Sequence, residues 1–143
     1  MAHDAQIRRT IEETTGARTV TVLDALMGEL RRLNPRRVAV FTPYVEDLTN
    51  RVARCVAEGG YQVVQNAGMG IRENLQIGRV TPEEILSFVE SHLTADVDCL
   101  FLSCTNWRAV ETIELLWRKL GIPIVSSNQA AIAAITCPAG AGA

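Results

Sequence analysis

The amino-acid sequence predicts an α/β fold built on a four-stranded parallel sheet with helices on both faces. Four short apolar runs have the length of buried strands. Two of these runs are apolar almost without interruption, as expected of strands that helices cover on both faces. Segments with helical apolar spacing alternate with the runs, which indicates parallel strands joined by right-handed crossover connections.

The predicted strands and the helices before them follow from these patterns. The strands read RVAVFTP, YQVVQN, DCLFLSC and PIVSSN, at 37–43, 61–66, 98–104 and 123–128. A short helix at about 5–14 and a longer helix at 21–34 are expected to precede the first strand. The longer helix has one apolar stripe, made by Leu23, Leu26, Met27, Leu30 and Leu33.

The helices that follow the strands carry start and stop signals. In TPEE at 81–84, Thr81 is an expected N-cap, Pro82 suits the first turn, and Glu84 completes a capping box. Gly121 is placed to end the helix after the third strand. Apolar residues at helical spacing predict two helices. One contains Val45, Leu48, Val52 and Val56, and the other contains Val110, Ile113, Leu116, Trp117 and Leu120. The resulting order of elements predicts a flavodoxin-like sheet.

Length, charge and hydropathy narrow the class of protein. The chain has 143 residues, which fits one domain, and a net charge of −2, which does not indicate a nucleic-acid partner. No apolar run reaches membrane-spanning length and the N-terminus lacks a hydrophobic signal region, so we expect no membrane contact and a cytoplasmic location. The expected parts are a helical extension at 1–20, an α/β domain at 21–136 and a flexible tail at 137–143.

Four cysteines occur in the sequence, and their spacing does not predict a metal site. None forms a CxxC pair, and His3 and His92 do not lie in a ligand pattern, so zinc is not expected. Cys99 falls inside a predicted strand and Cys55 inside a predicted helix, where packing is the expected role. Cys137 lies near the chain end and is expected to be an incidental thiol.

Cys104 differs because it stands where the third predicted strand leaves the sheet, in FLSCTN. Thr105 or Asn106 is expected to cap the next helix, which would place the thiol at a helix N-terminus. Such a position favours the thiolate form and hence reactivity. The residues alone leave two interpretations open: a working thiol at the mouth of a site, or a small buried packing residue.

Ligands of open parallel α/β sheets collect at the carboxyl ends of the strands. Those ends are TPY, NAGMG, SCTN and SSN, which are polar, small or reactive, and they predict a small-molecule site. Tyr44 is expected either to bind an anion or to pack at a strand–helix corner. Asn74 is expected in a loop, as a site residue or a turn former. For Ser126, Ser127 and Asn128, helix capping is favoured over carboxylate binding.

Four stretches together resemble a known family. VAVFTPY, ENLQIGRVTPEEI, ADVDCLFLSCTNWRAVETIE and LGIPIVSSNQA, in this order, resemble the C-terminal half of maleate cis-trans isomerases and of arylmalonate decarboxylases. Both belong to the aspartate/glutamate racemase superfamily. The resemblance runs from about 21 to 130 and implies a fold of two similar four-stranded halves that face each other, each offering a cysteine to the substrate.

The resemblance also implies roles for individual residues. Cys104 matches the second-half cysteine, which transfers a proton. Tyr44 and Asn74 match residues that hydrogen-bond a substrate carboxylate, and the backbone N–H groups of Cys104 and Thr105 are expected to hold a carboxylate. The implied substrate is a small dicarboxylate such as maleate, and no metal or organic cofactor is expected.

This chain departs from the resemblance because nothing before Thr21 matches the first half or its cysteine motif. We therefore expect a half-enzyme that is inactive alone, since positioning and the opposing nucleophile carry much of the catalysis. Three functions stay open: an isomerase or decarboxylase-like lyase, a non-catalytic dicarboxylate-binding half-domain, or a remnant with an exposed apolar face. A homodimer that brings two Cys104 thiols together, with exposed Val and Leu of 21–34 at its interface, is expected to restore a complete site.

Overall fold

The computed structural model describes residues 2–136 of the chain. The expectations for Cys137 and for the tail at 137–143 concern residues outside this range. Within it, four strands form one parallel sheet in the order β2-β1-β3-β4. The predicted parallel, flavodoxin-like sheet is therefore confirmed. The strands are β1 (Arg37–Tyr44), β2 (Gln62–Ile71), β3 (Cys99–Leu102) and β4 (Ile124–Ser126).

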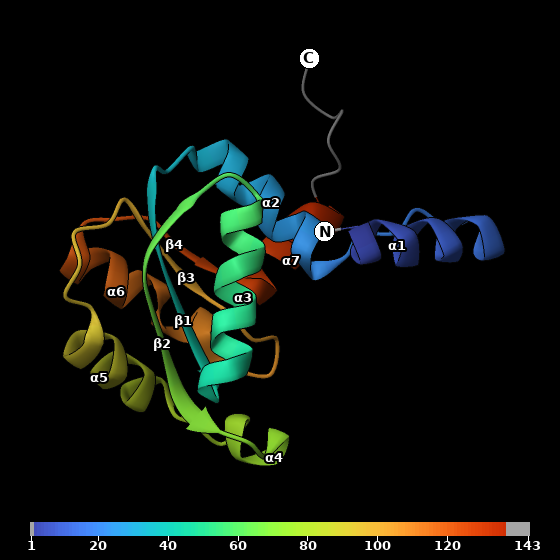
Figure 1. Cartoon of the computed structure of the whole chain (residues 1–143). Coiled ribbons are helices and arrows are strands. Elements are labelled where there is room, and N and C mark those ends of the chain that lie inside the picture. Colours follow the sequence, from blue (N-terminus) through green and yellow to red (C-terminus); the bar gives the residue numbers. More distant parts are fainter. Residues whose placement is uncertain (1, 137–143) are drawn as a thin grey trace.

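Helices cover both faces of this sheet, as Figure 1 shows. One buried cluster joins the sheet to α5, η1 and α6, and another joins it to α2, α3 and α7. Helix α1 extends away from the sheet, and α4 lies beyond the end of β2. The helices are α1 (Ala2–Thr15), α2 (Val22–Leu33), α3 (Glu46–Glu58), α4 (Asn74–Ile77), α5 (Pro82–His92), the 3₁₀ helix η1 (Arg108–Thr112), α6 (Ile113–Leu120) and α7 (Ser127–Thr136).

The sequence of β1 is apolar because its side chains are buried on both faces of the sheet. Ala39 and Phe41 pack in the cluster with α5, whereas Val38 and Val40 pack in the cluster with α2 and α3. Alternate side chains of a strand point to opposite faces, and all four of these residues are fully buried. Burying a side chain such as that of Phe41 contributes about 1.5–3 kcal/mol, so both faces of β1 stabilise the fold.

The helix boundaries confirm the capping signals. Thr81 Oγ1 accepts from the Glu84 backbone N–H at 3.3 Å, and the Thr81 N–H donates to Glu84 Oε2 at 2.7 Å, which completes the predicted capping box. Gly121 ends α6 in the left-handed conformation, with φ of 67°. Thr21 also caps α2, because its Oγ1 accepts from the Asp24 N–H at 3.1 Å.

Strand β2 continues well past the predicted end at residue 66. Ala67, Gly68 and Ile71 still pair with β1. A Cβ at Gly68 would lie 2.3 Å from the Tyr44 carbonyl oxygen and 2.4 Å from Thr49 Oγ1. Glycine therefore allows close backbone approach here, and the segment NAGMG is strand rather than the loop that its glycines suggest.

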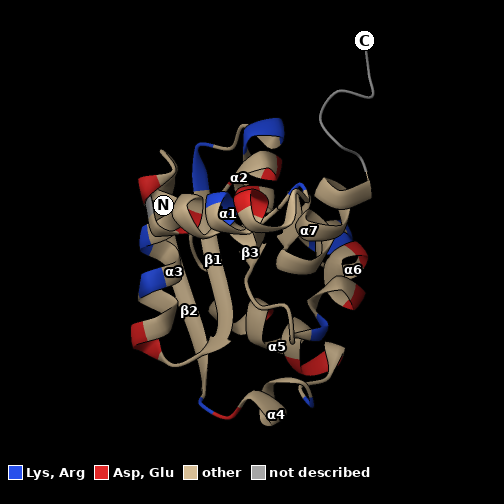
Figure 2. Cartoon of the chain, turned by 90° about the vertical axis from the view of Figure 1, so that its right-hand side faces the viewer, with Lys and Arg blue, Asp and Glu red and all other residues tan. Residues whose placement is uncertain are grey.

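The expectation of exposed Val and Leu along 21–34 is largely wrong. Leu26 and Leu30 of α2 are buried in the core that α2 shares with α7 and the sheet, and Val22 alone among its Val and Leu residues is clearly exposed. Figure 2 shows charges of both signs on α1, α2, α3 and α6, whereas α7 carries none. Ile132 and Ile135 of this uncharged helix are 59% and 69% exposed.

Candidate functional site

Cys104 follows β3 at the carboxyl edge of the sheet. Its thiol is free, and the residue is 6% exposed. It packs in the same cluster as Phe41, Leu102 and Trp107. Cys104 is therefore buried and packed, and it lies at the strand end where ligands of open parallel sheets bind.

The segment after Cys104 differs from the sequence prediction. Thr105 and Asn106 form a turn rather than a helix cap, and the next helix is η1, which begins only at Arg108. Trp107 is the residue before η1, and no side chain caps that helix. The prediction of a helix cap at Thr105 or Asn106 is therefore wrong, and the Cys104 thiol does not stand at the first turn of an α-helix.

Hydrogen bonds from the turn explain this difference. Residues 103–106, which we call the Cys104 loop, are tied to neighbouring elements on two sides. Asn106 Nδ2 donates to the Asn74 carbonyl oxygen at 2.7 Å and to Asn74 Oδ1 at 3.1 Å. Asn128 Nδ2, from α7, donates to the Thr105 carbonyl oxygen at 3.0 Å. The polar groups of the loop thus bind α4 and α7 instead of capping a helix.

Tyr44 lies next to the Cys104 thiol. It is the last residue of β1, is half-buried, and packs against the cluster that contains Cys104. Burial raises the pKa of Tyr44, and its hydrogen bond and electrostatic interaction with the Cys104 side chain raise it further. The phenol therefore stays protonated at neutral pH, as a hydrogen-bond donor next to the thiol.

The corner that holds Tyr44 is itself fixed by hydrogen bonds. The Tyr44 N–H donates to Thr42 Oγ1 at 3.0 Å, and the buried hydroxyls of Thr42 and Thr49 lie 2.7 Å apart. Buried hydroxyls with a partner avoid a desolvation cost of about 1–3 kcal/mol. This network sets the backbone from which the Tyr44 ring reaches Cys104.

Asn74 is the first residue of the four-residue helix α4, and its side chain is exposed. Asn74 follows strand β2, and Tyr44 is the last residue of strand β1. Cys104 and Thr105 follow strand β3. Chain topology therefore gathers the predicted site residues at one edge of the sheet. Tyr44 lies next to Cys104, and Asn74 is joined to the Cys104 loop through Asn106.

Sequence reasoning missed the anchoring roles of Asn106 and Asn128. Both lie in segments that had been singled out as strand ends, SCTN and SSN, but capping was the expected role. Capping is confirmed for Ser126, whose Oγ accepts from the Gln129 N–H at 3.1 Å. Contacts such as that between Asn106 and Asn74 join residues 32 positions apart, so local sequence carries no signal for them.

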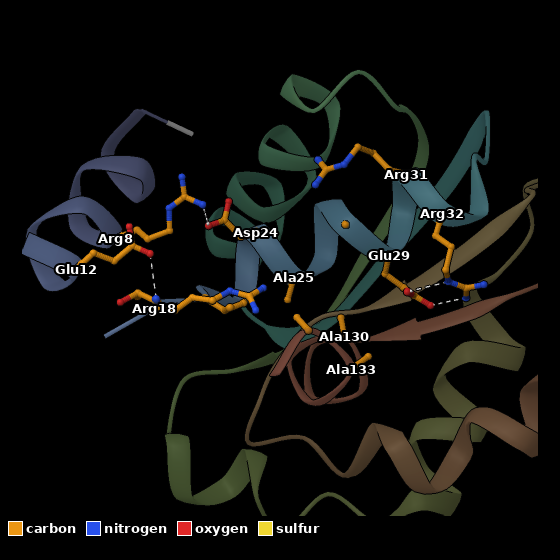
Figure 3. Close-up of a pocket in the computed structure, with 14 residues that line it drawn as sticks. Arg8, Glu12, Arg18, Asp24, Ala25, Glu29, Arg31, Arg32, Ala130 and Ala133 are labelled. Atoms are coloured by element: carbon orange, nitrogen blue, oxygen red, sulfur yellow. Dashed lines mark hydrogen bonds and ion pairs between the residues drawn. The ribbon is translucent and has the colours of Figure 1, made fainter. Parts of the chain in front are cut away.

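A cavity of about 710 Å³ lies away from these residues, between α1, α2 and α7, as Figure 3 shows. Arg8 pairs with Asp24 at 3.1 Å, and Arg32 pairs with Glu29 through two hydrogen bonds. These pairs largely offset the positive charge of the cavity. None of Tyr44, Asn74, Cys104 and Thr105 lines it, so this cavity is separate from the candidate site.

Two further observations concern the part of the chain that the structure describes. Within residues 2–136, no group of three or more His, Cys, Asp or Glu side chains is arranged to hold a metal ion. The helices of this same part of the chain are all too short or too polar to cross a membrane.

Comparison with known proteins assigns this chain to a family. The sequence profile of the arylmalonate decarboxylase family matches residues 1–143. The chain is 31% identical to the arylmalonate decarboxylase of Bordetella bronchiseptica over 99% of its own length and 60% of that protein. It is 26% identical to the maleate isomerase of Geobacillus stearothermophilus, over 82% of this chain and 47% of that protein. The chain spans about half the length of the curated relatives it matches.

Solved structures agree with the sequence comparison. A crystal structure of arylmalonate decarboxylase superimposes with a TM-score of 0.88 at 30% identity, covering 100% of this chain and 64% of that one. A maleate isomerase from Pseudomonas putida S16 with maleate superimposes with a TM-score of 0.82 at 26% identity, covering 92% and 53%. The profile match over residues 1–143 and the structural superposition agree, and the chain belongs to the arylmalonate decarboxylase family.

Proposed function

We propose that this chain carries a site for cofactor-independent cysteine acid–base chemistry on a small dicarboxylate, of the maleate cis-trans isomerase type. The observation that carries the proposal is the Cys104 thiol beside the half-buried, protonated Tyr44 phenol at the carboxyl edge of the sheet. A thiol can exchange a proton with a substrate carbon, and a phenol can hold the adjoining carboxylate.

The neighbouring groups suit a carboxylate. Among the described residues, the backbone N–H groups of Cys104 and Thr105 donate to no protein acceptor. Two successive N–H groups of this kind bind anions when they point toward a ligand. The exposed Asn74 amide adds a neutral donor. In the proposed site, Cys104 moves the proton while Tyr44, Asn74 and these N–H groups hold the substrate.

The proposed isomerisation needs a second thiol. One thiolate adds to an alkene carbon of maleate, and Cys104 protonates the neighbouring carbon. The new carbon–carbon single bond rotates, Cys104 takes the proton back, and loss of the thiolate restores the double bond as fumarate. We propose that a second copy of the chain supplies the opposing thiol, in a homodimer that pairs two Cys104 residues across a two-fold axis.

The test adds the purified chain to maleate and follows the alkene protons by NMR. The variants are Cys104→Ala and, as a matched control, Cys55→Ala, which removes a partly exposed thiol on α3. Fumarate from the wild type and from Cys55→Ala, but not from Cys104→Ala, would support the proposal. Absence of turnover by the wild type would refute activity of this chain by itself.

A decarboxylase-like lyase is the second candidate, favoured by the family profile that matches the whole chain. In this reaction carbon dioxide leaves an arylmalonate, and Cys104 protonates the resulting enediolate. The same protein samples, supplied with phenylmalonate, distinguish the two activities. Production of phenylacetate without any fumarate from maleate would favour the lyase.

A dicarboxylate-binding half-domain without turnover is the third candidate. It is favoured if maleate binds saturably by calorimetry, Tyr44→Phe weakens the binding and no reaction occurs. The homodimer is tested separately by sedimentation, and a monomer at all concentrations would rule it out. We also propose a cytoplasmic location, since the free thiols of Cys55, Cys99 and Cys104 suit a reducing compartment.

A further inference from the structure

Two hydrogen bonds from Asn106 determine which way the side-chain amide of Asn74 is oriented. Its Nδ2 lies 2.7 Å from the Asn74 carbonyl oxygen and 3.1 Å from Asn74 Oδ1. A backbone carbonyl can only accept a hydrogen bond, so the Asn106 atom facing it has to be the NH2 group. The amide of Asn106 is thereby oriented by the main chain.

That orientation determines the orientation of Asn74. The same Asn106 NH2 group lies 3.1 Å from the Asn74 side chain, so the Asn74 atom that faces it has to be the acceptor Oδ1. The Asn74 Nδ2 group then faces away from Asn106. Among the described residues it has no protein acceptor, and the side chain is exposed, so both of its hydrogens remain available to a ligand.

Gly78 leaves the space that this arrangement needs. A Cβ at Gly78 would lie 3.3 Å from both Nδ2 and Oδ1 of Asn106, closer than side chains normally pack. Gly78 ends α4, the helix that Asn74 begins. One turn of α4 therefore holds the Asn106 amide from two sides, by hydrogen bonds at its start and by close packing at its end.

We propose that Asn106 is a positioning residue, which turns the Asn74 amide so that its NH2 group faces the ligand and selects an anionic acceptor such as a carboxylate. The inference rests on the proposed function, because it assigns the ligand-facing donor of the same site. Without Asn106, the Asn74 amide can rotate and present its oxygen, which repels a carboxylate. Asn106 itself makes no contact with the ligand in this arrangement.

The first measurement is an NMR titration of the full chain with maleate, following the side-chain NH2 signals of both asparagines. We expect the Asn74 NH2 signals to shift with maleate and the Asn106 NH2 signals to stay. The Asn106 hydrogens should also exchange slowly with solvent before maleate is added, because both are hydrogen-bonded. Fast exchange of the Asn106 hydrogens, or a maleate-induced shift larger for Asn106 than for Asn74, would overturn the proposal.

The second measurement compares maleate affinities of variants by calorimetry. Asn106→Leu keeps the approximate side-chain shape without a donor and should weaken binding by about fivefold or more, since hydrogen bonds to charged groups contribute appreciably. Asn106→Asp should weaken it further, because the new carboxylate attracts the Asn74 NH2 group and turns the amide around. Gly78→Ala, which crowds the Asn106 amide, should weaken binding in the same direction.

The matched control is Asn66→Leu. Asn66 Nδ2 donates to Asn50 Oδ1 at 2.6 Å, so this variant breaks an exposed Asn–Asn hydrogen bond of the same kind, at the β2 edge. It should leave maleate affinity unchanged. Unaltered affinity in Asn106→Leu, with a wild-type melting curve, would overturn the role of Asn106. Absence of maleate binding by the wild type, with slow exchange at Asn106, would refute the proposed function while the Asn106–Asn74 contact stands.

Discussion

Tyr44, at the end of β1, lies against the thiol of Cys104, which follows the neighbouring strand β3. The two residues are 60 positions apart in the sequence and meet because parallel strands bring their carboxyl ends to one edge. Their contact joins a hydrogen-bond donor to a potential proton-transfer group.

The first prediction concerns ionisation of Tyr44. Burial and the Cys104 contact both raise its pKa, so the phenol should titrate above the ordinary value of about 10. The difference in ultraviolet absorbance between wild type and Tyr44→Phe isolates this titration from that of Tyr61. Cys104→Ala should lower the midpoint without restoring the ordinary value, because burial is the larger cause. A midpoint at or below about 10 in the wild type would contradict the structure.

The second prediction concerns stability at alkaline pH. Burial, and to a smaller extent the nearby Glu29 and Asp98 carboxylates, raise the pKa of the Cys99 thiol from 9.0 to about 12. The folded state thus favours the protonated thiol. This contribution is complete below the unfolded pKa and is lost as pH rises from about 9 toward about 12.

Cys99→Ala should therefore reduce the fall in unfolding free energy between about pH 8 and about pH 11. Urea unfolding at several pH values measures this slope. Cys55→Ala is the control, since Cys55 is only partly buried. Equal slopes in Cys99→Ala and the wild type would show that the Cys99 thiol does not carry this pH dependence.

The third prediction contrasts two glycines. Gly68→Ala places a methyl group against the Tyr44 carbonyl oxygen, and we expect it to destabilise the fold by about 1–3 kcal/mol. Gly28 lies inside α2, where the nearest atom to an added Cβ would be Arg31 Nη2 at 3.9 Å. Gly28→Ala should therefore stabilise the fold by about 0.5–1 kcal/mol. Thermal and urea unfolding measure both. If Gly68→Ala were as stable as Gly28→Ala, the close pairing of β1 with β2 at Gly68 would be wrong.

The fourth prediction contrasts two threonines at helix starts predicted from the sequence. Thr81→Ala removes the capping hydrogen bond of α5 and should cost about 1 kcal/mol of unfolding free energy. Thr105→Ala should change stability by less than about 0.5 kcal/mol, since its exposed side chain caps no helix. Urea unfolding separates the two values, and equal losses would indicate that Thr105 caps a helix after all.

The parallel sheet, its strand order and several helix ends can be predicted from the amino-acid sequence. These features depend on signals within a few residues. The apolar run of β1 reports burial on both faces, the spacing from Thr81 to Glu84 forms a capping box, and Gly121 takes a left-handed conformation. The sequence also marked the strand ends that carry Tyr44 and Cys104, because parallel topology places all such ends together.

Which side chains meet at that edge depends on long-range packing, on which local sequence patterns carry no information. Trp107 is 1% exposed and Trp117 is 56% exposed, although helical spacing had grouped Trp117 with the apolar residues of its helix. Because Trp107 is buried and the Cys104 loop makes hydrogen bonds to other elements, the next helix begins only at Arg108. The Asn106–Asn74 contact links segments that local patterns cannot relate, because its two hydrogen bonds need the segments after β2 and after β3 to lie at the same edge of the sheet.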